Sequence, residues 1–164
     1  MKTVLKWTGR LVLVLLVGVG LLALLGPREK VDLSAGFDAS LLGDDIDAYF
    51  EREEAKFSDI VEGVQKRVVW AGDVGVKTPI SVLYIHGFSA TSEEIRPVPD
   101  KVAEALGANL VYTRLTGHGR SGAAMAQATA SDWMRDTAEA LAAARAVGVS
   151  VLIKPLFRPR IDFL

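Results

Sequence analysis

The stretch VLYIHGFSATSEE, residues 82–94, places His-Gly at the end of an apolar run and a loop immediately after it. The run at 80–85 is rich in β-branched residues, which predicts a β-strand. In the loop that follows, a backbone N–H facing the carboxyl edge of a sheet can stabilise the oxyanion of a tetrahedral intermediate. The stretch therefore predicts a strand that ends at a candidate reaction centre.

Strands and helices alternate on both sides of this stretch. The predicted elements are strands at 67–71 and 109–115 and helices at 100–106 and 131–147, with Gly148 ending the last helix. This alternation is typical of an α/β layer fold whose neighbouring strands are parallel.

An amphipathic helix is predicted to begin at Asp44 or Asp45, either of which can cap it. Apolar and charged residues then fall on opposite sides of the helix, and the charged side is interpreted as a solvated face. The apolar side holds Ile46, Tyr49, Phe50, Phe57, Ile60 and Val61, and the charged side holds Glu51, Arg52, Glu54 and Lys56.

The N-terminal part of the chain contains an apolar run that begins at Leu11 and ends at Gly26, without a charged or strongly polar side chain. As a helix rising ~1.5 Å per residue, residues 7–26 would just cross a hydrocarbon core of ~30 Å. We therefore predict a single-pass membrane anchor at 1–26, with membrane lipid as its partner. The alternative is a cleaved signal peptide, but the sequence LLALLGPREK at 21–30 offers no A-x-A cleavage site.

Basic residues on either side of the apolar run bear on its orientation. Lys2, Lys6 and Arg10 precede the run, which favours a cytoplasmic N-terminus with the rest of the chain outside. Arg28 and Lys30 on the far side act against that orientation.

The stretch TRLTGHGRSG, residues 113–122, has two interpretations. Gly117, Gly119 and Gly122 match the G-x-G-x-x-G spacing of a dinucleotide-binding turn. Such a turn opens a helix directly and is followed by an acidic residue at the end of the next strand. Here a run rich in Ala, Gln and Thr precedes the helix, and the nearest suitable acid, Glu139, lies inside it. The second interpretation is a loop at the rim of a hydrolase site.

Three pieces in order, YIHGFSA at 84–90, TRLTGHGRSG at 113–122 and ASDWMRDTAEALAAAR at 130–145, favour the second interpretation. With this set the sequence resembles the α/β-hydrolase family, in its monoglyceride-lipase, lysophospholipase and serine-aminopeptidase branch. The resemblance covers about 67–148 and implies hydrolysis of lipid-like carboxylic esters by a serine hydrolase.

The family resemblance also implies roles for individual residues. The residue after His-Gly, here Phe88, would donate its backbone N–H to the oxyanion hole, and His86 and Gly87 would shape the turn. Gly117, His118 and Gly119 would form the rim of the site. The simpler interpretation of His86 is a side chain that hydrogen-bonds backbone and holds the loop.

The resemblance ends before the nucleophile. In the family a G-x-S-x-G elbow follows the next strand, and the acid and the catalytic His come later. After Gly148 the sequence reads VSVLIKPLFRPRIDFL, in which 149–153 resembles the start of that strand and Lys154-Pro155 replaces the elbow. Ser89, Asp100 and His118 occur in triad order, but nothing in their spacing brings them together. No catalytic residue is identifiable, so we expect a truncated chain without triad activity.

These observations divide the sequence into four parts. We predict a membrane anchor or signal peptide at 1–26, a linker at 27–43, the N-terminal portion of an α/β-hydrolase domain at 44–148 and an atypical tail at 149–164. The predicted fold class is a partial α/β-hydrolase parallel sheet with an N-terminal transmembrane helix. Two other functions stay open: a non-catalytic hydrolase-like binding or structural module, and a nucleotide-binding oxidoreductase.

Composition excludes further classes. The net charge is -1, with Lys+Arg 19 against Asp+Glu 20, and no basic cluster is interleaved with aromatic residues outside the N-terminus, so nucleic acid is not an expected partner. With Cys 0 there is neither a disulfide framework nor a thiolate metal site, and His 2 is too few for a zinc centre. We expect no metal and no cofactor.

Overall fold

The computed structural model describes residues 2–155 except 27, 30, 33 and 35. It divides into two compact units, Met1–Lys30 and Val31–Leu164, which are described separately. The first unit is helix α1, Lys2–Leu25. Within it, Lys6–Leu25 is long and apolar enough to cross a membrane, a property that signal sequences share. The predicted apolar helix is therefore confirmed, and its insertion in a membrane stays a prediction.

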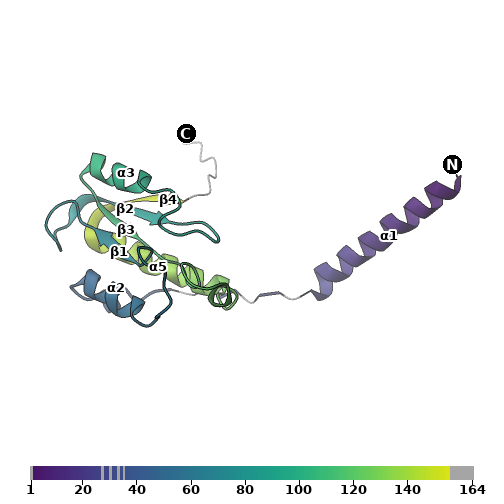
Figure 1. Ribbon diagram of the computed structural model, residues 1–164, viewed down its shortest axis with the longest axis horizontal. Coiled ribbons are helices and arrows are strands. Elements are labelled where there is room, and N and C mark those ends of the chain that lie inside the picture. Colours follow the sequence, from purple (N-terminus) through teal and green to yellow (C-terminus); the bar gives the residue numbers. More distant parts are fainter. Residues whose placement is uncertain (1, 27, 30, 33, 35, 156–164) are drawn as a thin grey trace. The chain divides into compact units, whose positions relative to one another are not determined.

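The second unit is built on a four-stranded sheet in the order β1-β3-β2-β4 (Figure 1). The strands are β1 at Arg67–Val69, β2 at Thr78–Ile85, β3 at Asn109–Tyr112 and β4 at Gly148–Pro155. β2 runs parallel to both β3 and β4. These central strands confirm a mixed α/β fold.

The outer strand β1 corrects the prediction that all neighbours are parallel, since it pairs with β3 in the antiparallel direction. The segment that joins β1 to β2, residues 70–77, contains no helix. Parallel strands of one sheet need a crossover of about a dozen residues or more, whereas this shorter connection reverses the chain between β1 and β2. Because β3 runs parallel to β2, β1 is antiparallel to β3 as well.

Helices cover both faces of the sheet. Figure 1 shows α3, Val98–Leu106, on one face and α5, Ala130–Val147, on the other. The helix α2, Ile46–Glu54, lies on the α5 side, where it packs into the same core cluster. The two short helices are η1 at Ala39–Leu42 and α4 at Gly122–Met125.

Alternating side chains of the central strands fill two cores. Leu83 and Val111 contact the cluster beneath α2 and α5, while Val82, Tyr84 and Leu110 belong to the cluster beneath α3. This alternation is what a strand buried on both faces produces. Leu42, in the predicted linker at 27–43, is buried in the first cluster.

Helix ends follow local capping signals. Asp45 caps α2, as predicted, and Thr129 with Asp132 forms a capping box at the start of α5. The helix predicted from Asp44 or Asp45 is shorter than its apolar stripe indicated. α2 ends at Glu54, so Phe57, Ile60 and Val61 lie beyond it. These residues are held by contacts with other parts of the chain. Two Arg guanidinium groups lie over the Phe57 ring, and the N–H of Val61 donates to the carbonyl of Gly119.

The strand predicted at 149–153 is present and longer, since β4 includes Lys154 and Pro155. It pairs with β2 from Gly148 to Pro155. The predicted tail at 149–164 therefore begins inside the sheet, and its residues 156–164 lie outside the described part. A Cβ on Gly148 would lie 2.6 Å from Ser81 N, so only glycine fits where α5 passes directly into β4.

Candidate functional site

Two loops meet at the carboxyl edge of the sheet because β2 and β3 are parallel neighbours. We call residues 86–90 the β2 loop and residues 113–121 the β3 loop. The β2 loop carries the predicted oxyanion donor Phe88 with His86 and Gly87, and the β3 loop carries the predicted rim residues. The fold thus brings together the residues that the family resemblance singled out.

Each loop contributes one histidine to the other. The backbone N–H of Leu115 donates to His86 Nε2 at 3.1 Å, and the backbone N–H of Ser89 donates to His118 Nε2 at 3.1 Å. The two imidazole rings lie 4.7 Å apart between centroids, and both side chains are buried. The loops are therefore joined by a reciprocal pair of hydrogen bonds, which we call the histidine clasp.

The remaining ring nitrogens define the protonation state of the clasp. His86 Nδ1 lies 3.0 Å from the carbonyl oxygen of Gly87, and His118 Nδ1 lies 3.2 Å from that of Thr116. A carbonyl only accepts, so each Nδ1 carries the proton and each Nε2 is a bare acceptor. Burial favours this neutral form: it lowers the pKa of His86 to about 4 and also lowers the pKa of His118.

Phe88 differs from its neighbours in being open to solvent. Its side chain is 74% exposed, and its ring makes edge contacts with His118 and Trp133 at centroid distances of 6.3 and 5.9 Å. Within the described part of the chain, its backbone N–H has no acceptor. The next residue, Ser89, has a left-handed φ of 57°. The β2 loop thus presents one unpaired donor beside a strained residue.

The β3 loop is fixed from the side of α2 by a buried ion pair. Arg114 donates to Glu54 through Nε at 2.7 Å and through Nη2 at 2.9 Å. Its third nitrogen, Nη1, donates to the carbonyl of His118 at 3.1 Å. Glu54 is thus buried, which corrects its interpretation as part of a solvated face. Helix periodicity carried no signal for this, because its partner lies sixty positions later.

Helix α5 fixes the same loop through Thr116. The N–H of Thr116 donates to Asp136 Oδ2 at 2.5 Å, and its carbonyl accepts from Trp133 Nε1 at 2.9 Å. Burial raises the pKa of Asp136. Asp136 therefore acts as a buried acceptor for the loop. One turn further along α5, Glu139 accepts from the Tyr49 hydroxyl at 2.5 Å and pairs with Lys66.

Turn geometry accounts for the glycine spacing. Gly117 and Gly119 have φ values of 82° and 64°, in the left-handed region that favours glycine. A Cβ on Gly119 would lie 2.6 Å from Val64 Cγ2. Between these glycines the His118 side chain is buried against the β2 loop, and Gly122 opens only the four-residue α4. The turn conformation and close packing of the β3 loop thus explain the glycine spacing that resembles a dinucleotide-binding turn.

The residues in triad order do not form a triad. His118 receives the backbone N–H of Ser89, and no hydrogen bond to the Ser89 hydroxyl is present in the described part. Asp100 accepts from the Tyr112 hydroxyl at 2.7 Å and pairs with Arg96. Among the described residues, no group of three or more acidic or histidine side chains is arranged to hold a metal ion.

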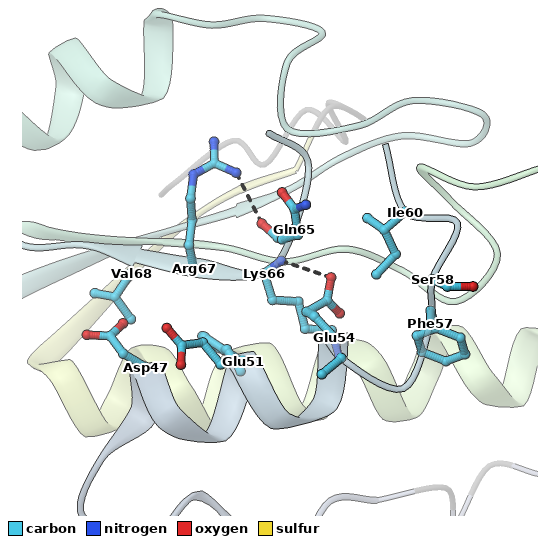
Figure 2. Close-up of a pocket in the computed structure, with 12 residues that line it drawn as sticks. Asp47, Glu51, Glu54, Phe57, Ser58, Ile60, Gln65, Lys66, Arg67 and Val68 are labelled. Carbon is cyan, nitrogen blue, oxygen red and sulfur yellow. Dashed lines mark hydrogen bonds between the residues drawn. The ribbon is translucent and has the colours of Figure 1, made fainter. Parts of the chain in front are cut away.

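A cavity of about 690 Å³ lies apart from the loops, between α2 and the start of β1. Figure 2 shows acidic side chains of α2, Asp47 and Glu51, beside it, with the Lys66 N–H bonded to Glu54. Asp47 also accepts from Trp70 Nε1 at 2.8 Å. Neither histidine of the clasp lines this cavity.

Part of the chain is similar in sequence to a known lipase. No family model matches the chain. Over 61 residues, 37% of this chain, it is 36% identical to the thermostable monoacylglycerol lipase of Bacillus sp. (strain H-257), of which the match covers 24%. A solved chain from a study of two metagenome-derived lipolytic enzymes, LipS and LipT, is 31% identical with a TM-score of 0.46, over 57% of this chain and 36% of that one. The lipase match confirms the α/β-hydrolase resemblance over part of the chain.

Proposed function

We propose that this chain is a membrane-anchored, hydrolase-like protein that provides the oxyanion-stabilising side of a site for lipid-like esters. The backbone N–H of Phe88, which has no acceptor among the described residues and lies at the carboxyl end of a central parallel strand, carries this proposal. An N–H held without an acceptor can receive the oxygen that becomes negative when an ester carbonyl is attacked. The likeness to a monoacylglycerol lipase supports a lipid-like ester as the ligand.

These 164 residues contain no G-x-S-x-G elbow and no histidine after His118. We propose that they carry out no triad-dependent ester hydrolysis by themselves. His118 is unsuited to act as a general base on Ser89, because its Nε2 lone pair already accepts the Ser89 backbone N–H. An oxyanion donor alone contributes a few kcal/mol to acyl transfer and provides no covalent route.

A covalent serine-hydrolase probe tests this function. Full-length chain in detergent should not be labelled by a fluorophosphonate, and any slow hydrolysis of a p-nitrophenyl ester should be the same after Ser89→Ala. Labelling that Ser89→Ala abolishes would contradict the proposed lack of a nucleophile. Equal labelling of both proteins would point to another serine, such as Ser121, and would contradict it as well.

The membrane anchor belongs to the same proposal. Helix α1 has the length and composition of a span over Lys6–Leu25. We expect the protein to stay with membranes during carbonate extraction and the unit from residue 31 onward to be cleaved by protease added outside the cell. A soluble product that starts near residue 27 would identify a signal peptide instead.

A further inference from the structure

The two histidines of the clasp act on successive peptide planes of the β2 loop. The carbonyl of Gly87 accepts from His86 Nδ1 at 3.0 Å and from the Ala90 N–H at 3.2 Å. In a trans peptide the C=O and the following N–H point in opposite directions, so this arrangement turns the Phe88 N–H away from both donors. The next peptide is held through the Ser89 N–H, which donates to His118 Nε2 at 3.1 Å.

Ser89 is where the loop needs external support. A non-glycine residue with a φ of 57° is strained by about 1–2 kcal/mol. Such residues persist where their surroundings fix them. The hydrogen bond to His118 is the contact that fixes the Ser89 N–H, and it comes from the neighbouring loop rather than from the β2 loop itself.

We propose that His118 is a positioning residue for the oxyanion donor: its imidazole holds the Phe88–Ser89 peptide. It thereby keeps in place the adjoining Gly87–Phe88 peptide, whose N–H is turned outward by the two donors to the Gly87 carbonyl. This role rests on the proposed function of Phe88. His118 does not touch the reacting atoms; it transmits the position of the β3 loop, which α2 and α5 hold, to the β2 loop.

The role requires a neutral imidazole with its proton on Nδ1, since an imidazolium has no lone pair for the Ser89 N–H. The charged groups around the ring are Arg114, whose Nη1 donates to the His118 carbonyl, and Asp136, which holds Thr116. Burial, with the Phe88 and Trp133 rings against the imidazole, opposes protonation most strongly and lowers the pKa of His118. The Thr116 carbonyl favours protonation, while Arg114 opposes it and Asp136 favours it to a smaller extent.

Nitrogen NMR of the full-length, ¹⁵N-labelled chain in detergent micelles tests the role without requiring turnover. We expect His118 to be the Nδ1–H tautomer at pH 7.5. In His118→Leu the amide signals of Ser89 and Phe88 should both shift, and Ser89 hydrogen exchange should accelerate about tenfold, as expected for the loss of a bond of about 1.4 kcal/mol. His118→Gln, which keeps an acceptor near the Nε2 position, should restore both signals toward wild type.

Arg120→Leu is the matched control on the same loop, because Arg120 pairs with Asp59 and not with the clasp. It should leave both amide signals unchanged. An Nε2–H tautomer of His118 would overturn the role, as would unchanged Ser89 and Phe88 signals in His118→Leu. If His118→Leu does not fold, the wild-type tautomer and the Gln variant decide. None of these readouts depends on ester hydrolysis, so failure of the proposed function would appear separately, in the probe experiment.

Discussion

The β3 loop and the β2 loop are neighbours at one edge of the sheet but are held in different ways. The β3 loop is tied to two helices through Glu54, Trp133 and Asp136. The β2 loop is tied to the β3 loop by the two imidazoles, and it leaves Phe88 exposed. One loop is therefore the support and the other presents a donor. Rigidity in the support and openness in the presenting loop are what the proposed oxyanion site would need.

The largest expected effect comes from breaking the support at its ion pair. Arg114→Met should lower the free energy of unfolding by about 3–5 kcal/mol, because Glu54 would keep a buried, uncompensated charge. Lys56→Met is the matched control, since it breaks the exposed pair with Glu53 and should cost about 0–1 kcal/mol. Urea unfolding of the full chain in micelles measures both. Equal costs would show that the pair does not support the fold.

Acid should weaken the clasp next. The pKa of His86 is about 4 in the folded chain against 6.5 when unperturbed, so the unfolded state binds the proton more tightly. Stability is therefore full above pH 6.5 and should fall by up to roughly 3 kcal/mol between pH 6.5 and 4. The raised pKa of Asp136 acts in the opposite direction, so the loss should be larger in Asp136→Asn. Stability that is constant over this range in both proteins would contradict a neutral, buried His86.

A smaller effect is expected where α5 holds Thr116. Asp136→Ala should cost about 2 kcal/mol at pH 7, because it leaves the Thr116 N–H without its acceptor. Asp136→Asn keeps an acceptor oxygen and should cost less than about 1 kcal/mol. Thermal unfolding distinguishes the two variants, and equal losses would mean that the hydrogen bond to Thr116 is not the reason for burying Asp136.

The presenting loop should give the smallest effect, with the opposite sign. Ser89→Gly relieves a left-handed residue, which is partly offset by the greater freedom of glycine in the unfolded chain, so stability should rise by about 0.5 kcal/mol. Ser58→Gly, at an exposed serine without a left-handed φ, should instead lower it slightly. A loss of stability in both variants would show that the backbone of Ser89 is not strained.

Local sequence patterns were sufficient to predict many of the strands and helices. The β-branched run ending at Ile85 formed β2, and the Ala-rich segment closed by Gly148 formed α5. The direction of β1 was not predictable from alternation, because it depends on a connection too short for a crossover. The length of α2 was overestimated, because Phe57 continues the apolar pattern of the helix but lies outside it, in contact with Arg114 and Arg120.

The positions of the two loops were predictable from the sequence, and most of the contacts that support them were not. The His-Gly motif at 86–87 and the Gly-His-Gly motif at 117–119 were enough to predict where the two loops lie. Glu54 resembled part of a solvated helix face, because its partner Arg114 lies far along the chain. The simpler interpretation of His86, a side chain that hydrogen-bonds backbone and holds the loop, is confirmed. Its reciprocal arrangement with His118 was not predicted, because each imidazole binds a backbone N–H of the other loop, and residue types do not reveal backbone partners.

Amide hydrogen exchange in the wild-type chain tests most directly whether one loop supports and the other presents. At neutral pH in micelles, the amides of Ser89 and Leu115 should exchange slowly, since both donate to buried imidazoles. The amide of Phe88, which has no acceptor in the described part of the chain, should exchange close to the rate of an unstructured peptide. A protected Phe88 amide, or Ser89 and Leu115 amides that exchange as fast as Phe88, would contradict the account.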